Sequence, residues 1–290
     1  MTGLLVINGF LESRKFNDIY GMLVSSSERL GIKLGIMKST EIPHNTESVK
    51  KLKYDFILFW DKDVVLAEIF EICGFRVFNS SAAILNSDNK AYTALKLRRA
   101  AVKAPVTITA PQTFEGVNYS SRGFVDSAAE IIGYPMVIKE LYGSFGQQVY
   151  LADCKAQAND IIDKIGYKGF LMQEFIETSR GRDIRINVVG QKAVSAMLRR
   201  SINGDFRSNI SNGGKAEKYA ASREQEDAAV KACAALGLDF AGVDILFGKG
   251  GEPVICEVNS NPHFKSTYDC TGVNMADEIL EYIRSKVEGI

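Results

Sequence analysis

Short apolar runs separated by amphipathic stretches occupy the first eighty residues. The runs predict buried strands at Leu4–Asn8, Ile32–Met37, Asp55–Trp60 and Phe75–Phe78. Between them, a helix is expected from an N-cap at Asn17 to Leu30 and another over Asp63–Cys73. Alternation of strand and helix is typical of a small doubly wound α/β domain, in which ligands bind beyond the carboxyl ends of the strands. We therefore expect a crevice near Asn8-Gly9, Trp60-Asp61 and Asn79-Ser80.

The pattern changes near Ala82. A helix is predicted from an N-cap at Asp88 to Ala101, which places Lys90 in the first turn, where the helix dipole disfavours a cation. A bound anion such as phosphate would explain Lys90, although exposed lysines occur at any position. Further predicted elements are the helix Gly123–Ile132 and the strands Pro135–Lys139, Val149–Ala152, Phe170–Ile176, Asp183–Val189 and Ala193–Ser201.

A glycine-containing loop, ELYGSFGQQ at residues 140–148, joins two of these strands. The backbone N–H groups of such a loop can bind phosphate oxygens, and Lys139 on the preceding strand could reach the same anion. An ordinary hairpin loop is the alternative, but it leaves Lys139 buried without a counter-charge, which is costly. The spacing fits neither a Walker A loop nor a G-x-G-x-x-G fingerprint.

The segment 202–218, INGDFRSNISNGGKAEK, is long, polar and rich in glycine. Loops of this size within compact domains often serve as lids or binding loops, and a connection without such a role is the alternative. After it, a capping box of Ser222 and Gln225 predicts a helix that ends at Gly237. An amphipathic helix over Val273–Val287 is expected to close the chain.

Two strands near the carboxyl end, Gly242–Phe247 and Glu252–Asn259, are predicted to form a hairpin. With Phe247 opposite Glu252, Asp244 lies opposite Ile255. One face then carries Asp244, Glu257 and Asn259, and the other, expected in a core, carries Val243, Ile245, Phe247, Val254, Cys256 and Val258. Two carboxylates and an amide oxygen suit Mg²⁺, and a solvent-facing polar side of a hairpin is the alternative.

Composition restricts the class of protein further. The 290 residues carry no net charge, so neither nucleic acid nor a membrane is indicated as a partner. The five cysteines form no C-x-x-C pair, which favours reduced thiols and gives no zinc motif. The apolar run at the N-terminus is too short for a signal peptide or a membrane span, so a cytoplasmic location is expected.

Taken in order, these features resemble the ATP-grasp superfamily, and within it the RimK-type α-L-glutamate ligases. The matching segments are MVIKELYGSFGQQV, FLMQEFIETSRGRDIR, AMLRRSINGDFRSNISNGGKAE and AGVDIL…CEVNSNP. The resemblance is dense from about Asp88 onward and thin over the first eighty residues. It implies an α/β fold with an N-terminal domain over residues 1–86 and an ATP-grasp domain over 87–290. The latter would consist of a central subdomain to about residue 172 and a C-terminal subdomain from about 173, with the nucleotide between them.

The resemblance also implies roles for individual residues. Lys90 and Lys139 would hold the nucleotide phosphates under the loop that contains Gly143, Ser144 and Gly146. Further nucleotide contacts would come from Glu174 and Phe175 at the adenine, from Asp183 at the ribose, and from Arg207, Ser208 and Asn209 in the lid. Asp244, Glu257 and Asn259 would bind Mg²⁺, usually as two ions, with Mn²⁺ as a substitute.

The implied reaction is the ATP-dependent joining of a carboxylate to an amine through an acyl phosphate. Arg199 is expected to stabilise the oxyanion, with Arg200 as second choice, while Arg207 and Asn209 assist the transfer. The substrates would be a small-molecule or peptide carboxylate and an amine such as a glutamate-like amino acid, and a homodimer or homotetramer is expected. Phosphoryl transfer to a hydroxyl and nucleotide binding without turnover are the alternatives.

One segment departs from the family pattern. Typical ligases carry a small, glycine-containing segment after Asn-x-x-Pro, where this chain has His263-Phe264-Lys265-Ser266. His263 could steer a substrate or act as a base, with a structural histidine as an equal alternative. Lys265 could meet an acidic group of a substrate, and His44 is expected at the surface. The departure leaves open whether glutamate is the amino acid transferred.

Overall fold

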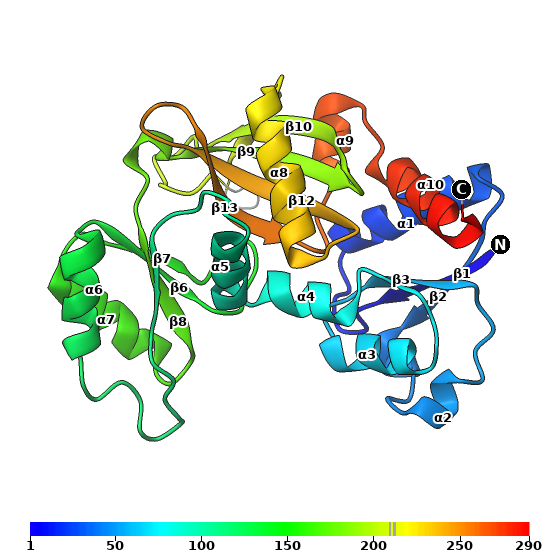
Figure 1. Ribbon diagram of the computed structural model, residues 1–290, viewed down its shortest axis with the longest axis horizontal. Coiled ribbons are helices and arrows are strands. Elements are labelled where there is room, and N and C mark those ends of the chain that lie inside the picture. The colour runs from blue at the N-terminus through cyan, green and yellow to red at the C-terminus, as the bar shows by residue number, and fades with distance from the viewer. Residues whose placement is uncertain (209, 211–212, 290) are drawn as a thin grey trace.

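The computed structural model describes residues 1–208, 210 and 213–289 and contains three sheets (Figure 1). The first sheet is parallel, with strand order β2-β1-β3-β4. Its strands are β1 (Thr2–Ile7), β2 (Lys33–Lys38), β3 (Phe56–Trp60) and β4 (Val77–Phe78). The connections between them contain α1 (Arg14–Arg29), η1 (Ser39–Glu41), α2 (Thr46–Val49) and α3 (Val64–Ile72).

Helices cover both faces of this sheet, because alternate residues of each buried strand point to opposite sides. On β1, Leu5 and Ile7 pack with α1 and with α10 (Met275–Glu288). Leu4 and Val6 pack on the other face, with residues of α2 and α3. The doubly wound arrangement is confirmed. Helix α10 thus returns to the first sheet, where it lies beside α1 (Figure 1). The first sheet together with α1, α2 and α3 is called the first domain below.

The second sheet is antiparallel, with order β5-β8-β6-β7. Its strands are β5 (Thr107–Thr109), β6 (Met136–Glu140), β7 (Val149–Ala152) and β8 (Phe170–Glu174). Two helices, α6 (Gly123–Ile132) and α7 (Lys155–Ile165), pack on one face against Met136 and Ile138 of β6. Alternation along β6 therefore directs Val137 and Lys139 to the opposite face.

The third sheet is also antiparallel, with order β11-β10-β9-β12-β13. Its strands are β9 (Arg182–Val189), β10 (Lys192–Arg200), β11 (Lys215–Lys218), β12 (Phe240–Phe247) and β13 (Pro253–Asn259). Residues of α4 (Ser81–Asp88), α5 (Lys90–Arg99) and α8 (Arg223–Leu236) pack on its core face. The remaining elements are η2 (Glu177–Ser179) and α9 (Lys265–Thr271).

Two predicted helix starts are wrong. Helix α1 begins at Arg14, after an extended Ser13, so Asn17 lies inside the helix. Asp88 ends α4, a helix that was not expected, and the N-cap of α5 is Asn89, whose side chain accepts from the N–H groups of Ala91 and Tyr92. Lys90 is still in the first turn of its helix, as expected. The capping box of Ser222 and Gln225 and the end of α8 at Gly237 are confirmed.

None of the helices in the described ranges is long and apolar enough to cross a membrane.

Candidate active site

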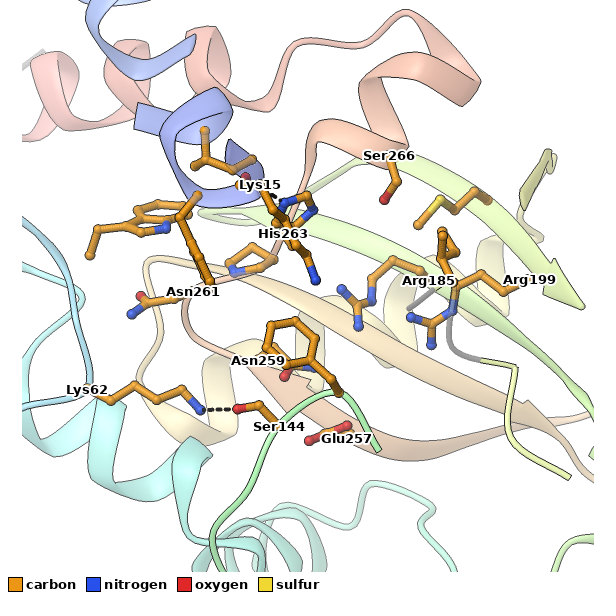
Figure 2. Close-up of a pocket in the computed structure, with 17 residues that line it drawn as sticks. Lys15, Lys62, Ser144, Arg185, Arg199, Glu257, Asn259, Asn261, His263 and Ser266 are labelled. Atoms are coloured by element: carbon orange, nitrogen blue, oxygen red, sulfur yellow. Dashed lines mark hydrogen bonds between the residues drawn. The ribbon is translucent and has the colours of Figure 1, made fainter. Parts of the chain in front are cut away.

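Two cavities adjoin at the centre of the molecule. The inter-sheet cleft, about 110 Å³, lies between the second and third sheets and is lined by residues such as Val137, Lys139, Phe175, Asp183, Arg207 and Leu246. The basic cavity, about 380 Å³, lies between the third sheet and the first domain and is lined by residues such as Lys15, Trp60, Lys62, Arg185, Asn259 and His263 (Figure 2). Arg199 and Glu257 line both cavities, so a molecule in one can meet a molecule in the other at these two side chains.

The inter-sheet cleft combines an apolar part with a charged end. Val137, Phe175 and Leu246 supply apolar walls, and the rings of Phe175 and Phe206 meet edge to face with their centroids 6.1 Å apart. Lys139 and Arg207 supply positive charge at the other end. Apolar walls with a few polar groups are typical of small-molecule sites, and this arrangement suits a heteroaromatic base attached to phosphates.

Two lysines, of which Lys139 is buried and Lys90 partly buried, line a small cavity beside the charged end of the cleft. Lys139 is 8% exposed, and its Nζ lies 3.6 Å from Sγ of Cys256. Nζ of Lys90 donates to the carbonyl of Gly143 at 3.1 Å and lies 4.0 Å from Oε1 of Glu257. Burial lowers the pKa of Lys90, and the positive charges of Lys139 and Lys62 lower it further. The negative charge of Glu257 acts in the opposite direction but does not offset them. An anion bound here would relieve this repulsion.

The glycine loop is held from both sides. Gly143 has φ +145°, and a Cβ at this position would lie 2.3 Å from Oε1 of Gln148, so only glycine fits. Nη1 of Arg207 donates to the carbonyl of Gly146 at 2.6 Å, while its Nη2 donates to Asp205 at 2.8 Å. The segment predicted as a lid therefore contacts the loop predicted to cover phosphates.

The hairpin β12–β13 has a different register from the predicted one. Ile245 pairs with Ile255, and a bulge follows, so that Asp244 pairs with Glu257. The bulge adds one residue on β13 and reverses the alternation of its side chains. Ile255, instead of Cys256, joins the core, and Cys256 and Glu257 both line the cleft. The prediction that Asp244, Glu257 and Asn259 share a face stands, but the prediction for Cys256 is wrong.

Asp244 lies in a buried network of alternating charge. Its Oδ2 accepts from Nη2 of Arg185 at 2.8 Å, and its Oδ1 accepts from Nη2 of Arg199 at 2.9 Å and from Nε of Arg185. Asp183 accepts from Nε and Nη2 of Arg199 at 2.7 and 2.6 Å. Burial would raise the pKa of Asp244, but the two guanidinium groups more than offset it and hold the pKa below its usual value. Burial would lower the pKa of Arg199, but the carboxylates of Asp183 and Asp244 more than offset it and raise the pKa above its usual value.

Oxygen atoms suitable for a hard cation remain beside this network. Oδ1 of Asp244 accepts from two guanidinium donors and Oδ2 from one, which leaves Oδ2 a lone pair. Glu257 has its nearest charged partner, Lys90, only at 4.0 Å. Nδ2 of Asn259 donates to the carbonyl of Gly242 at 3.5 Å, so its amide oxygen is a further candidate ligand. These donors fit Mg²⁺. The set depends on the amide of Asn259 as its third ligand. Within residues 1–208, 210 and 213–289, no cluster of three or more His, Cys, Asp or Glu side chains could hold a metal by itself.

Comparison with known proteins agrees with this geometry. The model of the RimK-like ATP-grasp domain matches residues 87–283. The chain belongs to this family. It is 37% identical over 222 residues to the "Probable alpha-L-glutamate ligase" of Legionella pneumophila, covering 76% of this chain and 70% of the relative.

Solved structures share the fold. The RimK domain ATP-grasp protein of Sphaerobacter thermophilus superposes with a TM-score of 0.74 at 18% identity, covering 96% of this chain and 98% of its own. The D-alanine–D-alanine ligase of Bacillus anthracis gives 0.75 at 16% identity, covering 99% and 97%. The predicted fold class and the predicted resemblance to ATP-grasp proteins are confirmed.

The inter-sheet cleft and the basic cavity bring together most of the predicted site residues. Lys139, Gly146, Phe175, Asp183, Arg207 and Ser208 line the cleft, and Ser144 and Asn259 line the basic cavity. The backbone N–H of Glu174 donates to the carbonyl of Val106 at 2.9 Å and is not available to a nucleotide. Asn209 lies outside the described residues.

Two other candidate residues, Arg200 and Lys265, lie outside both cavities. Arg200 lines neither cavity: its side chain is 46% exposed and lies 3.9 Å from Glu217. Lys265 pairs with Asp269 within α9 and is likewise absent from the lining of both cavities. His263 does line the basic cavity, where its Nε2 bonds to the carbonyl of Lys15 at 2.9 Å and burial lowers its pKa.

The sequence prediction missed the contribution of the first domain to the site. Nζ of Lys15 lies 3.7 Å from the ring centroid of Phe145 in the glycine loop. Nζ of Lys62 donates to Oγ of Ser144 in the same loop at 3.4 Å (Figure 2). The signal for Lys62 was its place immediately after Trp60-Asp61, where a crevice was expected at the end of a strand. Lys15 lies in an amphipathic helix and carried no such signal.

Proposed function

We propose that this ATP-grasp enzyme joins a carboxylate to an amine through an acyl phosphate, with ATP in the inter-sheet cleft and the two other substrates in the basic cavity. The observation that carries the proposal is the junction of the cavities at Arg199 and Glu257. A γ-phosphoryl group leaving the cleft and a carboxylate in the basic cavity would meet there. Carbon–nitrogen ligation also fits the ligase names of the relatives from Legionella pneumophila and Bacillus anthracis.

In the first step, a carboxylate oxygen of the substrate attacks the γ-phosphorus, and ADP leaves. Lys90 and Lys139 would hold the phosphates, and the contact between Arg207 and Gly146 would keep the glycine loop closed over them. Asp244, Glu257 and Asn259 would hold Mg²⁺, which supplies charge neutralisation at the phosphates. Burial is the main cause of the lowered pKa of Lys90, so a bound phosphate would favour the charged form of this lysine.

In the second step, the amine nitrogen attacks the acyl carbon, loses a proton, and phosphate leaves. Asp183 and Asp244 hold Nε and Nη2 of Arg199, and Nη1 donates no hydrogen bond to any described residue. We infer that Nη1 donates to the oxyanion of the tetrahedral intermediate. Fixed donors of this kind need no reorganisation during the reaction, which is why they stabilise transition states effectively.

The basic cavity favours an anionic substrate. Lys15, Lys62, Arg185 and Arg199 line it, and Glu257 is the one acidic residue in the described lining. Met197, Phe16 and Trp60 add apolar surface. We therefore infer that an acidic amino acid, glutamate or a near analogue, is one substrate, added to a small molecule or to a peptide or protein tail.

A screen tests this function. The protein is incubated with ATP, Mg²⁺ and pairs drawn from a panel of amino acids and carboxylates, while phosphate release is recorded and products are weighed by mass spectrometry. We expect ADP, phosphate and a product that equals the two substrates minus water. A stable phosphoester without free phosphate would instead indicate transfer to a hydroxyl, and tight ATP binding without any turnover would indicate a binding module. Glu257→Gln serves as the matched inactive control.

A further inference from the structure

Lys62 links the first domain to the glycine loop. It lies two residues after the end of β3, and its ammonium group forms an ion pair with Asp88 at the end of α4. The same Nζ donates to Oγ of Ser144 at 3.4 Å. Figure 2 shows the Lys62 side chain extended toward Ser144, with Glu257 and Asn259 also lining this cavity. An ammonium group has three N–H donors, so one donor remains after Asp88 and Ser144.

The backbone of Lys62 is anchored to the proposed metal-binding strand. The Lys62 N–H donates to Oδ1 of Asp61 at 2.6 Å, and Nδ2 of Asn8 donates to the same oxygen at 2.9 Å. Nδ2 of Asn261, two residues after Asn259, donates to the carbonyl of Asp61 at 2.9 Å. The position of Lys62 is therefore tied to that of Asn259, although the two residues lie far apart in sequence.

Lys62 contacts the same turn of the glycine loop as Lys90. Nζ of Lys90 donates to the carbonyl of Gly143, and Nζ of Lys62 donates to Oγ of the adjacent Ser144. Lys90 and Lys139 belong to α5 and β6, whereas Lys62 comes from the first domain. The three cations thus come from separate elements and act on the same space.

We propose that Lys62 is a third phosphate-binding lysine, which contacts the γ-phosphoryl group during its transfer to the substrate carboxylate. This inference rests on the proposed function. Lys62 lines the basic cavity but not the inter-sheet cleft, so it is placed for the terminal phosphate and not for the α- and β-phosphates. The first domain would then take part in the chemistry as well as in substrate binding.

Nucleotide affinity provides the test, because it does not require a known substrate. Calorimetry with Mg²⁺ and either ADP or a non-hydrolysable ATP analogue compares wild type with Lys62→Met. We expect the variant to lose about tenfold in affinity for the analogue, as for loss of one charge-assisted hydrogen bond. Its ADP affinity should stay within about twofold, which also shows that the variant is folded. An unchanged ratio of analogue to ADP affinity would overturn the proposal.

Two further variants separate phosphate contact from a structural role. If Lys62 acted only through its ion pair with Asp88, Asp88→Asn would reproduce the loss, whereas we expect it to retain the analogue affinity. Lys62→Arg should recover part of the loss, and Lys51→Met, which changes an exposed lysine away from both cavities, should behave as wild type. Lys139→Ala checks the nucleotide site itself and should lose affinity for both ADP and the analogue. Unchanged affinities in Lys139→Ala would contradict the proposed function, whereas an unchanged affinity ratio in Lys62→Met alone would contradict only this inference.

Discussion

Asp244 lies directly opposite Glu257 across the β12–β13 pair, because the bulge after Asp244 shifts the register of the two strands. Two carboxylates at such positions repel each other. Arg185 and Arg199 compensate the charge of Asp244, while Glu257 has, among the described residues, only Lys90 as an ion-pair partner, at 4.0 Å. The pair therefore combines one carboxylate fixed by the protein with one that is free to bind a cation.

This asymmetry predicts different effects for two conservative variants. Glu257→Gln should abolish Mg²⁺-dependent ADP formation and leave the free energy of unfolding within about 1 kcal/mol of wild type, since no guanidinium loses its partner. Asp244→Asn should also abolish turnover but destabilise the fold by about 3–5 kcal/mol, because it leaves buried guanidinium charge uncompensated. Urea denaturation and ADP assays measure both. Undiminished turnover in both variants would rule out the metal assignment.

Arg199→Lys should lower kcat by about 10²–10³-fold, as for removal of one oxyanion donor. Lysine keeps the charge but cannot contact Asp183 through two N–H groups and reach the cavity at the same time. Steady-state kinetics with the substrate pair found in the screen measure this change. Arg200→Lys, on the neighbouring exposed position, is the control and should retain wild-type kinetics. Equal losses in the two variants would contradict the role given to Arg199.

Asn79→Ala should destabilise the protein by about 3 kcal/mol or more, because several buried partners would lose their hydrogen bonds. Nδ2 of Asn79 donates to the carbonyls of Phe240 and Ser260, each at 3.0 Å. Its Oδ1 accepts from the N–H groups of Asp239 at 2.6 Å and Phe240 at 3.2 Å. Chemical denaturation measures the effect. Asn86→Ala, which removes a single bond of 3.4 Å to Leu236, should cost much less.

The two histidines should give opposite contributions to the pH dependence of stability. A hydrogen bond to Asp63 raises the pKa of His44 above 6.5, so its contribution is present below pH 6.5 and is lost as the pH rises through the folded pKa. Burial beside Lys15 and Arg185 lowers the pKa of His263, so its contribution is present above pH 6.5 and is lost as the pH falls through the folded pKa.

Unfolding free energies between about pH 5 and 8 check this difference. Relative to wild type, His44→Asn should lose most stability at the acidic end of the range, and His263→Asn should lose most at the neutral end. Parallel pH profiles for both variants would contradict the assigned environments.

Periodicity predicted most of the strands, but it missed the helices α4, α7 and α9 and could not predict the contacts between distant segments. The strand carrying Lys139 and the helix from Ser222 followed directly from alternation and capping. The bulge at Asp244 was not predictable in this way, since regular alternation assumes an unbroken register. Adjacent residues on a strand face opposite sides, so only one of Arg199 and Arg200 could face the cleft; Arg199 was the first choice, and it lines both cavities.

The contribution of Lys15 and Lys62 was missed for a related reason. Their partners, Phe145 and Ser144, lie more than eighty residues away, in a loop that was linked only to phosphate binding. Similarly, the N-cap of α5 is Asn89, while the preceding Asp88 ends α4 and pairs with Lys62, a partner that no local pattern reveals.

The packing of α10 on the first sheet has a consequence for biosynthesis. Met275, Ile279 and Ile283 bury Leu5, Phe56 and Leu58 together with α1. The first strands emerge from the ribosome more than two hundred residues before α10, the helix that shields one side of them. That side stays exposed until α10 has emerged, so a polypeptide cut off before residue 275 should be prone to aggregation.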